Sequence, residues 1–340
     1  MDKTLMEQTA RAIVAKGKGL LAADESSGTC EKRFSSVGVA CTETTRRDYR
    51  ELLFTTPGAQ EFISGIILFD ETLRQKGRDG TPFAEYLQQQ GIIPGIKVDG
   101  GAKDLAVSPG EQVTEGLDGL RGRLSEYFKL GARFAKWRAV INIGADIPTP
   151  GCIEANAHAL ARYSALCQEA SIVPIVEPEV MLEGDHSIAR CLEVSEATLR
   201  ALFAALVEQK VSLEHVILKA SMVLTGNKAP KRAGVEEVAE QTIKCLKRTV
   251  PAALPGVVFL SGGQIDEEAT AHLNAMNAIG GAPWPLTYSY SRALQSAALK
   301  TWSGKESQWK AAQAAFAHRA RMNSLASQGK WAADAEKRAA

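Results

Sequence analysis

Short apolar runs alternate with longer stretches of mixed polar and apolar residues along the whole chain. The runs are continuous rather than alternating, which is typical of parallel strands that are covered by helices. Eight runs are predicted as strands: residues 19–24, 63–70, 94–99, 133–140, 173–179, 216–221, 257–262 and 286–291. Helical patterns are predicted between them at residues 44–54, 117–131, 153–170, 195–210, 235–250, 266–280 and 305–330.

This alternation predicts an α/β protein with a TIM (β/α)₈ barrel, because each strand is followed by a helix or a long connection. A doubly wound open sheet would give the same alternation. Polar residues cluster at the C-terminal end of nearly every run, and this favours the barrel, whose sites lie on that face. We expect one barrel domain over residues 1–330, with an N-terminal and a C-terminal helix. Residues 331–340 are expected to be a mobile tail with no apolar anchor beyond Trp331.

The composition narrows the functional classes. Of the 340 residues, 45% are hydrophobic and 23% are charged, with a net charge of +1. A net charge this close to zero gives no overall indication that the protein binds nucleic acid or an anionic membrane. No apolar run reaches the roughly 18–20 residues of a membrane span. The six cysteines include no CxxC pair and are expected to be reduced thiols.

Three lysines lie inside strand-like apolar runs: Lys97 in PGIKVD, Lys136 in RFAKWRAV and Lys219 in HVILKAS. A buried lysine is costly if it stays charged and unpaired. Such lysines usually serve as nucleophiles, acids or phosphate ligands, or they form buried ion pairs. Three of them in one chain indicate a polar pocket at the strand ends.

The period of two along a strand sorts the neighbours of these lysines by face. The residues that share one face of a strand are Lys136 with Arg138, Glu177 with Glu179, Lys219 with Ser221, and Asp24 with Ala22. If these faces point into the barrel, two lysines, three carboxylates and an arginine converge. A deprotonated lysine can condense with a ketone or aldehyde, and the carboxylates can supply an acid and a base. These residues alone leave open which lysine is the nucleophile, and a buried ion-pair network is the structural alternative.

A phosphate site is predicted after the seventh and eighth strands, where TIM barrels commonly have one. The glycines of FLSGGQ (259–264) expose backbone N–H groups that can cradle a phosphate, and Arg292 follows the last strand. Lys97 is either a second phosphate ligand or the partner of Asp99. The segment ADESSGTCEKR (23–33) could meet an anion, or form a capped, solvated helix.

No HxH, HExxH, Walker or strand-linked GxGxxG pattern occurs in the chain. We therefore expect neither a metal nor a nucleotide cofactor.

Together, the motifs resemble class I, Schiff-base fructose-bisphosphate aldolases over about residues 5–330. The motifs are LLAADESSGTCEKR, ISGIILFDETL, PGIKVDGG, GARFAKWR, VPIVEPE, ILKASMV, FLSGGQ, SYSRAL and NSLASQGK. The resemblance implies a TIM barrel, a homotetramer and no metal. It implies reversible cleavage of fructose 1,6-bisphosphate to dihydroxyacetone phosphate and glyceraldehyde 3-phosphate. Alternatives are another Schiff-base sugar-phosphate aldolase and a non-catalytic scaffold barrel.

The resemblance also implies roles for individual residues. Lys219 matches the Schiff-base lysine, Glu177 the acid and base of carbinolamine chemistry, and Asp24 the group tied to C–C cleavage. Glu179 supports Glu177, and Lys136 and Arg138 line the site. The positions that match the pocket for the phosphate on carbon 1 are Ser261, Gly262, Gly263, Ser289 and Arg292. Those that match the other phosphate are Lys97, Ser26, Thr29 and Arg33.

The chain departs from the family pattern at several positions. Ala220 stands where the family usually has proline, Gly100 where it has lysine, and Ser291 where it has glycine or alanine. No tyrosine follows Tyr290, although many members end in one, so the tail is either truncated or the proton exchange is handled otherwise.

The segments SGTCEKR and LFTTPGAQEFISG resemble plastid-type members. This resemblance implies a processed protein of the chloroplast stroma that acts in the Calvin cycle. Sedoheptulose 1,7-bisphosphate would then be a second product of the enzyme. The cytoplasm is the alternative compartment.

Overall fold

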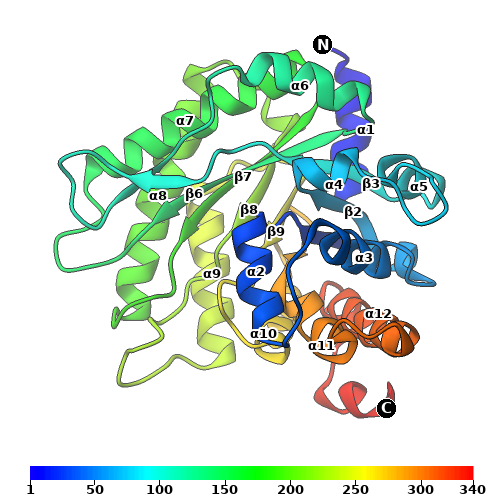
Figure 1. Ribbon diagram of the computed structural model, residues 1–340. Coiled ribbons are helices and arrows are strands. Elements are labelled where there is room, and N and C mark those ends of the chain that lie inside the picture. Colours follow the sequence, from blue (N-terminus) through cyan, green and yellow to red (C-terminus); the bar gives the residue numbers. More distant parts are fainter. Residues whose placement is uncertain (340) are drawn as a thin grey trace.

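Eight parallel strands close into a barrel in the computed structural model, which describes residues 1–339 (Figure 1). The order around the barrel is β1-β10-β9-β8-β7-β6-β3-β2. The strands are β1 (Gly19–Ala23), β2 (Ile63–Leu68), β3 (Ile93–Lys97), β6 (Phe134–Ile141), β7 (Val173–Val180), β8 (Ile217–Ala220), β9 (Gly256–Phe259) and β10 (Leu286–Tyr290). Closure confirms the predicted TIM barrel and excludes the open sheet. An antiparallel hairpin, β4 (Ala102–Asp104) with β5 (Gln112–Thr114), was not predicted.

Helices surround the strands, and each predicted helix is present (Figure 1). The predicted ones are α3 (Glu43–Phe54), α6 (Leu120–Lys129), α7 (Pro150–Glu169), α8 (Ile188–Glu208), α9 (Val235–Thr249), α10 (Asp266–Ile279) and α12 (Trp309–Ala326), together with the N-terminal α1 (Lys3–Ile13). Helices without a predicted range are α2 (Ser27–Ser35), α4 (Asp70–Arg74), α5 (Phe83–Gln89) and α11 (Arg292–Trp302).

Capping residues explain why two helices begin earlier than predicted. The Thr149 hydroxyl accepts a hydrogen bond from the Cys152 N–H at 3.2 Å, and Pro150 occupies the first turn of α7. The Ser187 hydroxyl caps α8 in the same way, at 3.2 Å from the Arg190 N–H. Apolar spacing located the helix interiors, whereas these polar side chains set their first residues.

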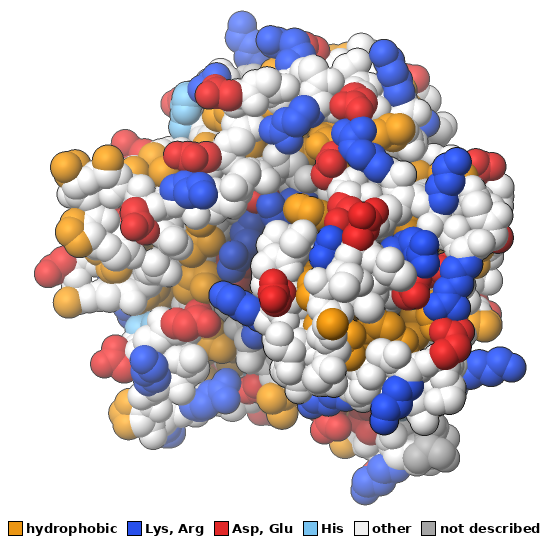
Figure 2. Space-filling view, in the orientation of Figure 1, with side chains coloured by type: hydrophobic (Ala, Val, Ile, Leu, Met, Phe, Trp, Pro, Cys, Tyr) orange, Lys and Arg blue, Asp and Glu red, His pale blue; other side chains and the backbone are white. Residues whose placement is uncertain are grey.

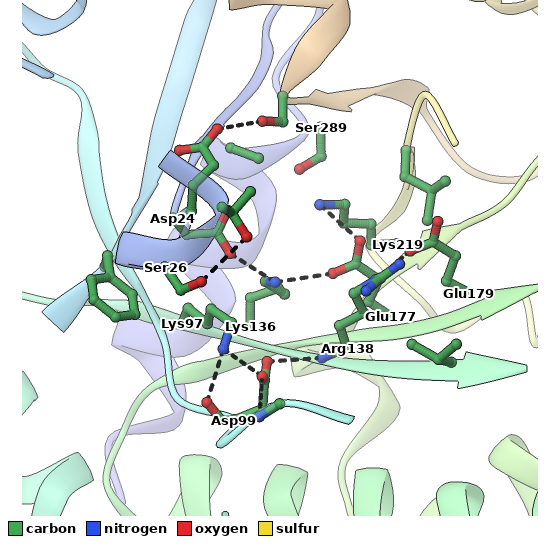
Figure 3. A pocket seen from close by; sticks show the side chains of 18 of the residues that line it. Asp24, Ser26, Lys97, Asp99, Lys136, Arg138, Glu177, Glu179, Lys219 and Ser289 are labelled. Carbon is green, nitrogen blue, oxygen red and sulfur yellow. Dashed lines mark hydrogen bonds and ion pairs between the residues drawn. The ribbon is translucent and has the colours of Figure 1, made fainter. Parts of the chain in front are cut away.

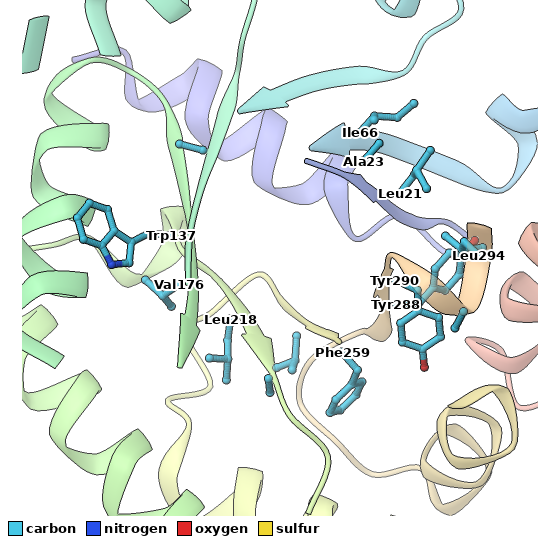
Figure 4. Close-up of a cluster of buried hydrophobic side chains, with 14 of the residues drawn as sticks. Leu21, Ala23, Ile66, Trp137, Val176, Leu218, Phe259, Tyr288, Tyr290 and Leu294 are labelled. Carbon is cyan, nitrogen blue, oxygen red and sulfur yellow. The ribbon is translucent and has the colours of Figure 1, made fainter. Parts of the chain in front are cut away.

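The first half of the barrel interior is apolar and is closed by α1. Buried side chains from the strands meet Met6, Ala10 and Ile13 of that helix in one cluster. Phe134 belongs to this cluster, and its ring lies so close to Gly95 that no Cβ atom would fit at that position. Outward-facing side chains, such as Trp137, Val176 and Leu218, pack instead against the surrounding helices (Figure 4). The Trp137 ring lies 5.5 Å from that of Tyr163 on α7.

The C-terminal segment has a polar anchor that sequence analysis missed. Residues Ala333–Ala339 form a short 3₁₀ helix. The Glu336 carboxylate accepts hydrogen bonds from Arg319 at 2.7 and 2.8 Å and from the Trp331 indole at 2.9 Å. The expected mobility of residues 331–340 stays a prediction, and Ala340 lies outside the described residues. Within residues 1–339, no helix has both the length and the apolar character needed to span a membrane.

Candidate active site

A cavity of about 560 Å³ opens at the carboxyl ends of the strands. Figure 2 shows a hollow in this face with lysine and arginine side chains inside it. All of the predicted site residues except Gly263 line the cavity: Asp24, Ser26, Thr29, Arg33, Lys97, Lys136, Arg138, Glu177, Glu179, Lys219, Ser261, Gly262, Ser289 and Arg292. Sequence positions that are far apart therefore converge, as the inward-facing assignment required.

Lys136 lies at the centre of a buried ion network (Figure 3). Its Nζ is 2.7 Å from Asp24 Oδ2 and 3.3 Å from Glu177 Oε2. The other Glu177 oxygen, Oε1, is 3.0 Å from Lys219 Nζ. Both lysines and Glu177 are at most 4% exposed. One carboxylate thus joins the two lysines, and a proton can pass between Lys219 and Glu177 without a change of geometry.

The network fixes the charge state of its members. Burial alone would raise the pKa of the Asp24 carboxyl, but Lys136 and Lys219 outweigh it and lower the pKa to about 2. Burial also opposes ionisation of Glu177, and Lys219, Lys136 and Arg138 still lower its pKa. For Lys136, burial favours the neutral amine, yet Asp24 and Glu177 raise its pKa well above the usual value. Lys136 therefore remains an ammonium ion near neutral pH.

Arg138 and Lys97 border the network and are held by carboxylates. The Arg138 guanidinium donates through Nε to Glu179, and its backbone N–H donates to Asp99 Oδ2 at 3.2 Å. Lys97 Nζ donates to Asp99 Oδ1 at 2.5 Å and to the Asp99 carbonyl at 2.9 Å (Figure 3). The Lys–Asp pair is thus present, and Lys97 also lines the cavity, so both interpretations of this lysine are compatible with its position.

The loop after β9 is shaped for close approach of a ligand to its backbone. Gly262 and Gly263 have φ angles of +51° and +87°, a region in which a side chain would be strained. Gln264 holds the loop, because its backbone N–H and its side-chain amide each donate to the Ser261 carbonyl at 2.9 Å. Gly263 does not line the cavity, but a Cβ atom there would lie 3.7 Å from Arg292 Nη2.

Hydroxyl groups and cations form two regions of the cavity that could bind anions. Ser289 Oγ is buried and has no hydrogen-bond partner among the residues that the structure describes, and it lies near Arg292 at the end of β10. At the start of α2, the hydroxyl oxygens of the N-cap Ser26 and of Thr29 lie 3.2 Å apart. An unpaired buried hydroxyl is costly unless a ligand satisfies it, which supports a polar ligand at Ser289.

Comparisons with known proteins match nearly the whole chain. The family model described as glycolytic, fructose-bisphosphate aldolase class-I, matches residues 5–340. The chain belongs to the class-I fructose-bisphosphate aldolases. These enzymes are lyases, and the resemblance seen in the motifs is confirmed.

Similar aldolases come from bacteria, plants and a protozoan. A probable fructose-bisphosphate aldolase class 1 of Xanthomonas campestris is 64% identical over 96% of this chain and 98% of its own length. A cytosolic fructose-bisphosphate aldolase of Arabidopsis thaliana is 53% identical over 95% of this chain and 90% of its own. A solved structure of the Plasmodium falciparum aldolase has a TM-score of 0.95 at 47% identity, covering 97% and 95% of the two chains.

Three features of this aldolase site escaped sequence reasoning. Glu25, Asp99 and Ser291 all line the cavity, although none was assigned to the site. Glu25 follows Asp24 directly, and the period-two rule gave no signal because the strand has already ended at Ala23. Among the described residues, no group of three or more His, Cys, Asp or Glu side chains is arranged to hold a metal ion.

The predicted face of Ser221 was wrong. Ser221 does not line the cavity with Lys219, because β8 ends at Ala220 and the alternation of faces stops there. Instead, the Ser221 hydroxyl accepts from the Val180 N–H at 3.0 Å and donates to the Val180 carbonyl at 3.1 Å. It therefore ties β8 to the end of β7.

Proposed function

We propose that this aldolase cleaves fructose 1,6-bisphosphate reversibly to dihydroxyacetone phosphate and glyceraldehyde 3-phosphate through a Schiff base on Lys219. The observation that carries the proposal is the unequal pairing of the two buried lysines. Lys136 forms ion pairs with two carboxylates, which keep it charged, whereas Lys219 forms one, with Glu177. An ammonium ion is no nucleophile, so the geometry favours Lys219.

In the first half of the reaction, Glu177 moves protons for Lys219. The carboxylate takes a proton from Lys219 Nζ, 3.0 Å away, and frees the amine to attack the ketone carbon. A second proton moves from the attacking nitrogen to the former carbonyl oxygen, which gives the carbinolamine hydroxyl. Protonated Glu177 then returns its proton to the carbinolamine hydroxyl, which leaves as water and gives an iminium ion. Lys136 and Arg138 stabilise the ionised form of Glu177 before it takes the proton and after it returns it.

In the second half, the iminium ion accepts the electron pair of the breaking C3–C4 bond. A base removes the proton of the C4 hydroxyl, and we assign this role to Asp24, which is ionised and lines the cavity. Substrate has to loosen the Asp24–Lys136 ion pair, because a carboxyl with a pKa of about 2 is a weak base. Protonation of the resulting enamine and hydrolysis release dihydroxyacetone phosphate and regenerate Lys219.

Two regions of the cavity suit the two phosphates. Ser261, Gly262 and Ser289 lie with Arg292 at the ends of β9 and β10, which suits the phosphate on carbon 1. Lys97, Ser26 and Thr29 lie at the ends of β1 and β3 and suit the other phosphate. A monophosphate aldolase would not need both. Turnover of fructose 1-phosphate as fast as that of the bisphosphate, at equal low concentration, would favour this second candidate.

Borohydride trapping tests the proposal directly. Dihydroxyacetone phosphate and borohydride are added to the protein, and the reduced adduct is located by peptide mapping. We expect one adduct on Lys219, none in Lys219→Met, and turnover that persists in EDTA. An adduct on Lys136, or none, would reject the mechanism. A Lys219→Met variant that retains all cellular function would support a scaffold role.

Assembly and compartment are further proposals that rest on the family. We propose a homotetramer, which light scattering of the purified protein can test. We propose the cytoplasm as the compartment, because the plant relative above is named cytosolic and the more similar relative is bacterial. The plastid expectation finds no support in these relatives. Activity on sedoheptulose 1,7-bisphosphate is a minor proposal that a direct assay decides.

A further inference from the structure

The guanidinium of Arg33, on α2, forms hydrogen bonds through one nitrogen and leaves its other N–H groups unpaired. Its Nη1 donates to Glu25 Oε1 and, at 3.0 Å, to Ser291 Oγ. Its Nε and Nη2 have no hydrogen-bond partner among residues 1–339, and the side chain lines the cavity with 24% of its surface exposed. A guanidinium whose free Nε–H and Nη2–H lie on one edge is suited to a phosphate, which can accept from both groups.

Ser291 joins Arg33 to the buried Glu25 carboxylate. Its hydroxyl donates to Glu25 Oε1 at 2.6 Å while accepting from Arg33, so one group serves both partners. Gln295 Nε2 donates to the same Glu25 oxygen at 2.9 Å, and Arg50 Nη2 donates to the other at 2.9 Å. Burial opposes the charge on Glu25, but Arg50 and Arg33 lower its pKa, so the carboxylate stays ionised and keeps its hold on Arg33.

Because Ser291 hydrogen-bonds with Arg33 and Glu25, its position places these residues at the β10–α11 end of the cavity. Ser291 lies between Ser289 of β10 and Arg292, the first residue of α11. It is the N-cap of α11, yet its hydroxyl caps no backbone N–H, because Glu25 and Arg33 engage it. The family pattern has glycine or alanine here, and neither side chain could make these bonds. Arg33 and Arg292 also line a smaller cavity of about 170 Å³ between α2 and α11.

We propose that Ser291 is a positioning residue that holds Arg33 at the β10–α11 corner, where its free edge binds the same phosphate as Ser289 and Arg292. This assigns Arg33 to the phosphate on carbon 1, not to the other phosphate as the motif resemblance implied. The inference rests on the proposed function for the identity of the substrate, but phosphate recognition itself does not require turnover.

Steady-state kinetics with two substrates test the assignment. Fructose 1-phosphate carries only the phosphate on carbon 1, so we expect Ser291→Ala to raise KM for it and for the bisphosphate by the same factor, about three- to tenfold. The kcat should change by less than twofold. Ser291→Thr, which keeps a hydroxyl, should recover most of the loss. Ser296→Ala, which removes an α11 hydroxyl bonded only to the Arg292 carbonyl, is the matched control.

Two results would overturn the proposal. An unchanged KM for both substrates means that Ser291 positions nothing of consequence, and a rise for the bisphosphate alone places Arg33 at the other phosphate. A double-mutant cycle distinguishes positioning of Arg33 from a nonspecific structural effect of the substitution. In an Arg33→Ala background, Ser291→Ala should have no further effect on KM. An additional loss there would show that Ser291 acts by another route.

Binding of inorganic phosphate, measured by calorimetry, separates this inference from the proposed reaction. Ser291→Ala should weaken phosphate binding by a factor similar to that for KM, even if the wild-type protein turned over neither sugar. Equal phosphate affinity in wild type and Ser291→Ala would refute the positioning role.

Discussion

The barrel interior has two halves that differ in chemistry although the same strands build them. On β6, the inward-facing Phe134 is followed by Lys136 and Arg138, and on β7, Ile175 is followed by Glu177. The first half is a buried apolar cluster closed by α1, and the second half is a charged cavity of about 560 Å³. The change occurs within one step of the strand repeat.

The two halves have opposite relations to stability. Burying an apolar side chain in the first half contributes about 1.5–3 kcal/mol. Burying a charge in the second half costs several kcal/mol of hydration, which ion pairs at best offset. The charged half is therefore not explained by folding. It marks the part of the molecule where chemistry, rather than packing, determines which residues are present.

The sharpest test of this contrast uses two residues on β8. Lys219→Met should lower kcat by about a thousandfold or more, because the nucleophile is lost, while the fold remains stable. Ile217→Ala, two residues earlier on the same face, should cost about 2–5 kcal/mol of unfolding free energy. Its kcat should stay near the wild-type value in the folded fraction. Chemical denaturation and steady-state assays on both variants check this, and similar profiles for the two variants would break the contrast.

Within the apolar half, truncation of Phe134 should strongly reduce the stability of the fold. Phe134→Ala should lower the free energy of unfolding by about 3–5 kcal/mol, because Gly95 and its neighbours cannot collapse into the space. Phe134→Leu should lose clearly less and serves as the control. Urea denaturation gives both values. A loss below about 1 kcal/mol for Phe134→Ala would show that this layer is loosely packed.

In the charged half, acid should reveal what the Asp24 pairing contributes. The folded-state pKa of Asp24, about 2, lies below the ordinary value of 3.8. Its contribution is therefore present above pH 3.8 and is lost as the pH falls through 2. Between pH 5 and pH 3, the wild type should lose about 1 kcal/mol more than Asp24→Asn does. Denaturation curves at both pH values measure this difference, and equal losses would mean that Asp24 is not held ionised.

The smallest effect is expected outside the barrel, at the C-terminal anchor. Glu336→Gln removes the charge that Arg319 pairs with at 2.7 Å, in a short terminal 3₁₀ helix that can detach without opening the barrel. The global free energy of unfolding should fall by less than about 1 kcal/mol, because the loss is confined to local opening. Hydrogen exchange of residues 333–339 should accelerate, since that segment depends on this contact. Fast exchange already in the wild type would instead confirm the predicted mobility.

Much of the fold was predictable because its signals are local. Each strand is a short apolar run, and the barrel was favoured because charges gather at one end of the runs. The β4–β5 hairpin was missed because each of its strands has only three residues. The helix α11 was missed although its buried residues, such as Leu294, Ala298 and Trp302, have helical spacing; it packs mainly on α12. Ser221 was misplaced because periodicity gives no signal once a strand has ended.

The sequence by itself indicated which strand-borne side chains face the cavity, because the period of two is a property of the backbone; the prediction failed only where a strand had ended. Only the tertiary structure decided how they pair. Lys136 and Lys219 are equivalent along the chain, and barrel closure gives one of them two carboxylates and the other a single one. Glu25, Arg33 and Ser291 meet for the same reason, since first and last strands become neighbours only when the sheet closes.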